Sequence, residues 1–176
     1  MKRKAERIML GGESNADCIL FNHTYISGTT QDVDGNYPEI PDCEIRFHLG
    51  TRPVILHNNT SDCPIDLSLT EYVGKLELIA NMVNQLLTHM EENPTENFLV
   101  REFLNPYKTE GRLFGGTLLL HYSYKYKNIT LDIADCSVKN RKAFSKEQFL
   151  SFADKLLYLI EQAVHHVQEI RKDMKI

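Results

Sequence analysis

Apolar residues recur at spacings of four and three positions in two stretches of the chain. This periodicity predicts two amphipathic helices, each of which buries one face. The two stripes match position by position at an offset of 77 residues: Tyr72, Leu76, Ile79, Val83, Leu86 and Met90 in the first, and Phe149, Ala153, Leu156, Ile160, Ala163 and Val167 in the second. A shared offset indicates that one structural unit occurs twice along the chain.

The predicted starts of both helices agree at the same offset. Ser68 and Ser145 each precede a Glu or Gln by three positions. This is the pattern of a capping box, in which side chains and backbone of the first turn bond reciprocally. Leu67 and Phe144, directly before the two serines, are placed to act as hydrophobic staples. We therefore expect the helices to begin at Ser68 and Ser145.

Alternating apolar and polar residues precede each helix, which predicts strands with one buried face. The positions that match at the offset of 77 are Ile45, Phe47, Leu49, Val54 and Leu56 in the first unit, and Tyr122, Tyr124, Tyr126, Leu131 and Ile133 in the second. Two-residue turns at 50–51 and 127–128 would close these strands into hairpins. Further strands are predicted at 18–27, at 97–104 and from Arg112 onward.

These elements predict an α+β fold, in which tandem duplicated antiparallel strands are each followed by an amphipathic helix and both helices pack on one sheet face. The first unit would span residues 1–92 and the second residues 93–176, together forming one compact domain. The last helix is predicted to run to about Lys172 and to be longer than the first. We expect its extra turns, with Val167 and Ile170, to project beyond the sheet, where they could mediate a homodimer.

Charge is unevenly distributed over the two predicted units. The chain has 176 residues and a formal net charge of −4, which argues against strong general nucleic-acid binding. Residues 1–92 hold 7 Lys and Arg against 14 Asp and Glu, a net charge of −7, whereas residues 93–176 hold 13 against 10, a net charge of +3. No apolar run is long enough for a membrane span and no signal peptide is visible, so we expect a cytoplasmic protein.

Candidate catalytic and metal-binding groups do not assemble into a site in the predicted strands. With a turn at 127–128, His121, Ser123 and Asp132 share one sheet face, but residues two apart on a strand lie roughly 6–7 Å apart, too far for a nucleophile–base hydrogen bond. With a turn at 50–51, Glu44 lies opposite His57, which favours a cross-strand charge pair over a metal site. We therefore expect no enzyme activity, no cofactor and no metal.

The order of elements resembles two groups of proteins. Strands followed by a helix, twice over, is the layout of Whirly and PUR-type nucleic-acid-binding proteins. The whole chain is also similar to small bacterial immunity proteins of the WapI type, through the segments CEIRFHLGTRPVIL, IDLSLTEYVGKLELIANMVNQLL, REFLNPYKTEG, ITLDIADC and FSKEQFLSFADKLLYLI. The second resemblance implies a non-catalytic protein that binds and neutralises another protein.

Two functions follow as hypotheses. The first is a protein-binding module, of immunity or inhibitor type, whose acidic first unit attracts a basic partner protein. Its predicted contact residues are Glu39, Asp42, Glu44 and Asp62. The alternative is a single-stranded nucleic-acid-binding protein that uses the outer sheet face with Arg46, Lys125 and Lys127. Several tyrosines near these lysines could stack on bases, although the offset of 77 places Tyr122, Tyr124 and Tyr126 on the core face.

Overall fold

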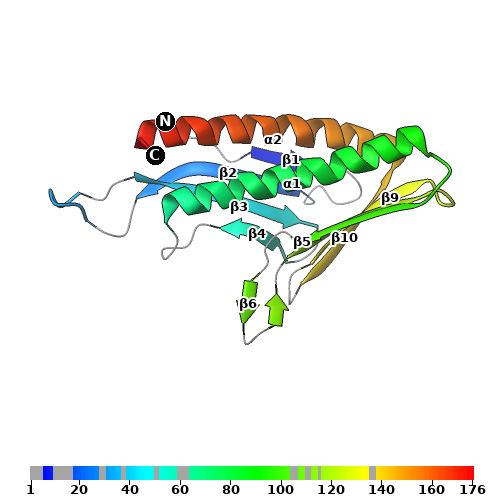
Figure 1. Ribbon diagram of the computed structural model, residues 1–176, viewed down its shortest axis with the longest axis horizontal. Coiled ribbons are helices and arrows are strands. Elements are labelled where there is room, and N and C mark those ends of the chain that lie inside the picture. The colour runs from blue at the N-terminus through cyan, green and yellow to red at the C-terminus, as the bar shows by residue number, and fades with distance from the viewer. Residues whose placement is uncertain are drawn as a thin grey trace.

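Two long helices lie side by side over two antiparallel sheets in the computed structural model (Figure 1). The structure describes residues 6–9, 18–27, 31–36, 39–49, 52–58, 64–103, 107–109, 112–114, 116–134 and 138–176. Helix α1 spans Ile65–Glu92 and helix α2 spans Lys146–Met174. The predicted α+β fold class is confirmed. Neither helix is long and apolar enough to cross a membrane.

Each half of the chain forms a four-stranded antiparallel sheet that is followed by a helix. Sheet 1 has the order β1-β2-β3-β4 and sheet 2 the order β5-β8-β9-β10. The strands of sheet 1 are β1 (Glu6–Met9), β2 (Cys18–Ser27), β3 (Glu39–His48) and β4 (Val54–Asn58). Those of sheet 2 are β5 (Phe98–Phe103), β8 (Thr117–Ser123), β9 (Asn128–Ala134) and β10 (Lys139–Ser145), and a small hairpin of β6 (Tyr107–Thr109) and β7 (Arg112–Phe114) is inserted between β5 and β8.

Each of the two helices contacts strands of both halves of the chain. Helix α1 contacts β3 and β4 of its own half and also β5 and β8 of the other half. Helix α2 contacts β9 and β10 of its own half and also β1 and β2 of the first half. The contacts are therefore related by an approximate two-fold exchange of the halves. A single apolar core joins residues from both sheets and both helices, because each helix buries its stripe against two sheets at once.

The predicted helix stripes are confirmed. All twelve of the matched stripe positions are buried. The capping box at Ser145 is present, with the Ser145 hydroxyl accepting from the Gln148 N–H and the Gln148 side chain accepting from the Ser145 N–H. The staple residue Phe144 packs edge-on against Phe149, with ring centroids 6.0 Å apart.

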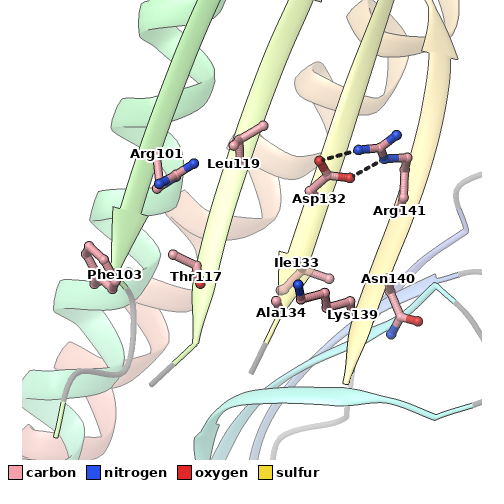
Figure 2. A pocket seen from close by; sticks show the side chains of 10 residues that line it. All are labelled: Arg101, Phe103, Thr117, Leu119, Asp132, Ile133, Ala134, Lys139, Asn140 and Arg141. Atoms are coloured by element: carbon pink, nitrogen blue, oxygen red, sulfur yellow. Dashed lines mark hydrogen bonds and ion pairs between the residues drawn. The ribbon is translucent and has the colours of Figure 1, made fainter. Parts of the chain in front are cut away.

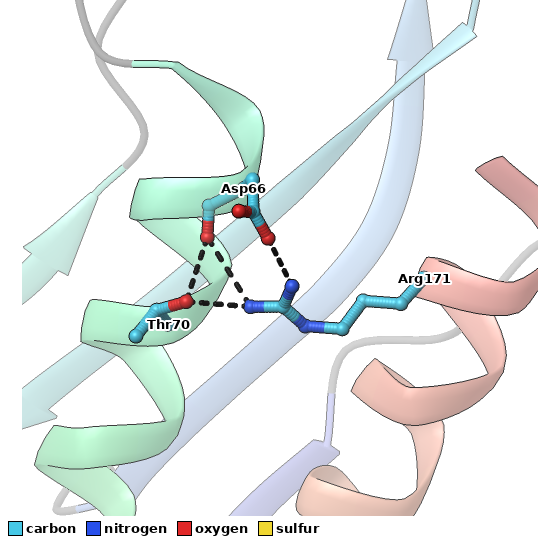
Figure 3. A network of polar contacts seen from close by, with 3 residues as sticks. All are labelled: Asp66, Thr70 and Arg171. Carbon is cyan, nitrogen blue, oxygen red and sulfur yellow. Dashed lines mark hydrogen bonds and ion pairs between the residues drawn. The ribbon is translucent and has the colours of Figure 1, made fainter. Parts of the chain in front are cut away.

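The predicted start of the first helix is wrong. Helix α1 begins at Ile65, with Pro64 at the N-cap position, so Ser68 lies buried inside the helix and Leu67 is exposed. The extra turn is held by a tertiary contact, because the Arg171 guanidinium at the end of α2 donates to the side chain and backbone oxygens of Asp66 and to the Thr70 hydroxyl (Figure 3). The helices are consequently similar in length, with 28 residues in α1 and 29 in α2.

The predicted projection of the last helix is also wrong. Val167 and Ile170 are each only 1% exposed and belong to the core. Helix α2 contacts β1 and β2 of the first half, and its C-terminal part runs over that sheet instead of projecting beyond it (Figure 1). The surface that motivated the proposed homodimer is thus covered within the chain, and homodimerisation itself stays a prediction.

The offset of 77 holds for the helices but not for the hairpins. Strand β10, which was not predicted, stands between the second hairpin and α2. The strand before each helix is therefore β4 in one half and β10 in the other, so the first hairpin corresponds to β9 and β10 and not to β8 and β9. The predicted turn at 127–128 is wrong as well, since β8 ends at Ser123 and pairs there with Asn128 across a four-residue loop. The predicted turn at 50–51 lies outside the described residues.

The early end of β8 changes which of its residues are buried. Tyr122 is buried, whereas Tyr124 and Tyr126 are exposed in the loop, contrary to the prediction. The core positions of β8 are instead Leu118 and Leu120, which lie in an uninterrupted apolar run where no alternation marks the inner face. Residues 124–127 thus form an exposed loop, which we call the hairpin tip.

Candidate nucleic-acid interface

The face of sheet 2 that points away from the helices presents an ordered array of side chains. Alternation along the strands directs Leu118, Leu120 and Tyr122 toward the core, and their neighbours toward the opposite side, which we call the outer face. The strand register arranges the outer-face residues in rows across β5, β8, β9 and β10. One row is Arg101, Leu119, Asp132 and Arg141, and the adjacent row is Phe103, Thr117, Ala134 and Lys139.

These two rows surround a hollow of about 470 Å³ (Figure 2). Its apolar surface includes Leu119, Ala134 and the ring of Phe103, which is 52% exposed. Its cations are Arg101, Lys139 and Arg141, one from the edge strand β5 and two from the edge strand β10. Asp132 is the one carboxylate among the lining residues that the structure describes. These described residues therefore carry a net positive charge around an apolar floor.

The carboxylate of Asp132 is already paired within the chain. The Arg141 guanidinium donates from Nε to Oδ1 of Asp132 at 2.6 Å and from Nη2 to Oδ2 at 3.1 Å. The hydrogen bond to Asp132, together with the attraction of its charge, raises the pKa of Arg141. No hydrogen bond or ion pair joins the side chain of Arg101 or Lys139 to another described residue, so both charges are available to a ligand.

The hairpin tip at the far end of β8 and β9 has a similar chemical character. Tyr124 and Tyr126 are 46% and 70% exposed, and the Lys125 ammonium lies 5.3 Å from the centre of the Tyr126 ring. Two hydrogen bonds fix the loop, one from the Tyr124 N–H to the Asn97 side chain and one from the Tyr126 N–H to the Ser123 hydroxyl. Lys127 is the last residue of the loop before β9 and has a φ of 51°, in the left-handed region.

The residues predicted to bind a protein partner are only partly described. Glu44 forms an ion pair with Arg46 at 2.6 Å, and its side chain is 12% exposed. Its charge is therefore partly satisfied within the chain. The backbones of Glu39 and Asp42 pair with Ser27 and Thr24 in the β2–β3 ladder. Asp62 lies outside the described residues.

The residues predicted for the nucleic-acid alternative are on two different surfaces. Lys125 and Lys127 are exposed at the hairpin tip of sheet 2, and Arg46 lies on β3 of sheet 1, paired with Glu44. The structure therefore brings the two lysines together but does not place Arg46 in the same sheet. The hollow between β5 and β10 contains none of these three residues.

The predicted absence of a catalytic arrangement rested on a register that the structure changes. Asp132 lies opposite Leu119, while Ser123 is buried and lies opposite Asn128. Glu44 lies opposite Asn58 instead of His57, because the β3–β4 register shifts between Ile45 and Arg46. Among the described residues, no three His, Cys, Asp or Glu side chains are grouped so that they could hold a metal ion.

Sequence reasoning missed the residues of the hollow: Arg101, Phe103, Lys139 and Arg141. A signal existed in the strand predicted at 97–104, where Leu99, Arg101 and Phe103 alternate with core positions. No comparable signal marked β10, whose sequence KNRKAFS is mostly polar. The four strands of the sheet bring these residues together from positions far apart in the chain.

Comparison with known proteins adds no assignment. No family model, no curated protein and no solved structure matches the chain.

Proposed function

We propose that the protein is a non-catalytic binding module that holds single-stranded nucleic acid on the outer face of sheet 2. The observation that carries the proposal is the hollow, whose described lining combines an apolar floor with three cations and one carboxylate that is already paired. Proteins that bind single strands combine a cationic surface for phosphates with aromatic side chains on which bases stack. The exposed ring of Phe103 and the charges of Arg101 and Lys139 match these two requirements.

The arrangement of layers favours a single strand over a duplex. Both helices pack against the inner faces of the sheets (Figure 1). In the described part of the chain, the outer face of sheet 2 therefore carries no helix that could enter a major groove. A single strand has unstacked bases whose faces can lie against a sheet surface. The overall negative charge of the chain weakens general attraction to nucleic acid, which makes binding dependent on this one surface.

The proposal can be tested by fluorescence anisotropy with a labelled oligothymidylate over a series of salt concentrations. Arg101→Ala/Lys139→Ala removes the two unpaired cations of the hollow. For single strands, log K falls with log salt by about 0.7 per neutralised phosphate, so we expect this variant to bind more weakly and with a slope about 1.4 units shallower.

A matched control removes the same charge from the helix layer. Lys155→Ala/Lys172→Ala changes two exposed lysines of α2, so it lowers the net charge equally without touching the outer face of sheet 2. The proposal requires this control to bind like the wild type. Equal losses in both variants would mean that total charge governs binding, and no binding by the wild type at low salt would refute the proposal.

A protein-binding function through the acidic first unit is the second candidate. The net charge of −7 over residues 1–92 favours it, since acidic inhibitors attract basic partners. It predicts that the wild-type protein binds no oligonucleotide in the same titration. A protein ligand for the hollow itself would also give this result, because an acidic peptide could satisfy Arg101 and Lys139 without any base.

A further inference from the structure

The hairpin tip and the hollow lie at opposite ends of the same pair of strands. The hollow occupies the rows of Thr117–Ala134 and Leu119–Asp132, and the tip follows the row of Ser123–Asn128. Ser123 follows Thr117 by six positions along β8, which at about 3.3–3.4 Å per residue is roughly 20 Å. Both ends carry exposed aromatic rings and lysine or arginine side chains.

The described residues of the surface between these ends carry no charge that would repel phosphates. The outer-face residues of the intervening rows are Leu99, His121, Thr130 and Ala143, followed by Ser123, Asn128 and Ser145. None of these seven residues is a carboxylate. A polyanion could therefore pass along these strands from the hollow to the tip without meeting an unpaired acid among the described residues.

The hairpin tip also folds toward the outer face of sheet 2. By alternation, Ser123 belongs to the outer face, together with Leu119 and His121. Its hydroxyl accepts a hydrogen bond of 3.3 Å from the Tyr126 N–H, and Ser123 is only 7% exposed. The loop thus folds over the outer-face side of Ser123, which is the side that carries the hollow.

We propose that the hollow and the hairpin tip form one continuous track, on which a single strand runs parallel to β8 and β9 and stacks a base on Tyr126. This inference rests on the proposed function and defines its ligand further: the site takes an extended strand of several nucleotides, and not an isolated nucleotide. Lys125 and Lys127 contact phosphates at the tip end of the track, as Arg101 and Lys139 do at the hollow.

The track predicts that the contribution of Tyr126 depends on ligand length. Oligothymidylates of about 3 and about 12 nucleotides lie near the two ends of the range of site sizes of single-strand binders, roughly 4–16 nucleotides. A short oligomer fills only the hollow, whereas the longer one reaches the tip. In anisotropy titrations, Tyr126→Ala should weaken binding of the longer oligomer by at least about 5-fold, the lower end of the effect of base–aromatic stacking, and leave binding of the short oligomer unchanged.

Two further variants separate stacking from other effects. Tyr126→Phe keeps the ring and should bind both oligomers like the wild type. Tyr158→Ala removes a similarly exposed tyrosine from helix α2, 61% exposed against 70% for Tyr126, and serves as the matched control. The track is refuted if Tyr126→Ala binds the longer oligomer like the wild type, if it weakens both lengths equally, or if the wild type binds both lengths with the same affinity. Absence of any wild-type binding would instead refute the proposed function.

Discussion

Ile170 offers the sharpest test of the way in which the halves are joined. It lies near the end of α2, is 1% exposed and belongs to the shared core. Helix α2 contacts β1 and β2, and its C-terminal part runs over the sheet of the first half (Figure 1), so we expect Ile170 to hold the helix of the second half on that sheet. Replacing it by Ala should therefore destabilise the entire protein and not only the last turns of the helix.

The expected magnitude follows from its burial. Truncating a buried Ile to Ala typically costs about 2–5 kcal/mol, from lost transfer free energy and the remaining cavity. Because α2 ends only four residues later, at Met174, part of the structure can relax, and we expect about 2–3 kcal/mol. For a protein of this size, about 1 kcal/mol corresponds to roughly 2–4 °C, so the Tm should fall by about 4–12 °C.

Urea denaturation followed by circular dichroism measures this change, with Ile176→Ala as the matched control. Ile176 is the same residue type only six positions later in the sequence, but it is 53% exposed, so its truncation should change the free energy of unfolding by less than about 0.5 kcal/mol. The reasoning is refuted if Ile170→Ala has an effect as small as that of the control. It is equally refuted if Ile170→Ala lowers the stability of only one of two separate transitions.

Two further substitutions test individual polar contacts. Arg171→Ala removes charged donors to Asp66 and Thr70, and because Arg171 and Asp66 are both partly exposed to solvent, it should lower the free energy of unfolding in urea denaturation by only about 1 kcal/mol. Arg171→Lys should restore only part of this stability, since an ammonium cannot bridge both partners as the guanidinium does. Unchanged stability of Arg171→Ala would contradict the role of this contact. Asp132→Asn should release Arg141 from its ion pair. In anisotropy titrations, oligothymidylate should then bind more tightly at low salt, and the slope of log K against log salt should be steeper by about 0.7. An affinity equal to that of the wild type would show that Arg141 does not contact phosphate.

The helix stripes could be predicted because burial acts on every turn of a long helix. Each of the six matched positions in α1 contacts the core, so the periodicity persists whatever happens at the ends. The start of α1 could not be predicted in the same way. The local signal at Ser68 favoured a cap, but burial of Leu69 and the contact of Arg171 with Asp66 extend the helix by a further turn. Arg171 lies more than 100 residues away in the sequence, beyond the reach of a local pattern.

Strand β10 and the hollow were missed for a related reason. The segment of β10 is mostly polar, and only Phe144 is buried in it. It forms a strand because β9 provides a partner for its full length, from Lys139 opposite Ala134 to Ser145 opposite Asn128. The hollow depends on this pairing, since Arg141 and Lys139 face Arg101 and Phe103 only when all four strands are in register. Composition and periodicity contain no information about that register.

The contact of each helix with the sheet of the other half has a consequence for how this fold could be built from two copies of one unit. Exchanging the halves converts the contacts of α1 with β3, β4, β5 and β8 into those of α2 with β9, β10, β1 and β2. This is the symmetry of an isologous dimer, in which each subunit would lay its helix across the sheet of its twin. Here a single polypeptide supplies both subunits, and the linker after Glu92 joins them. The surfaces that one unit would use to pair with a copy of itself are therefore already occupied inside the chain.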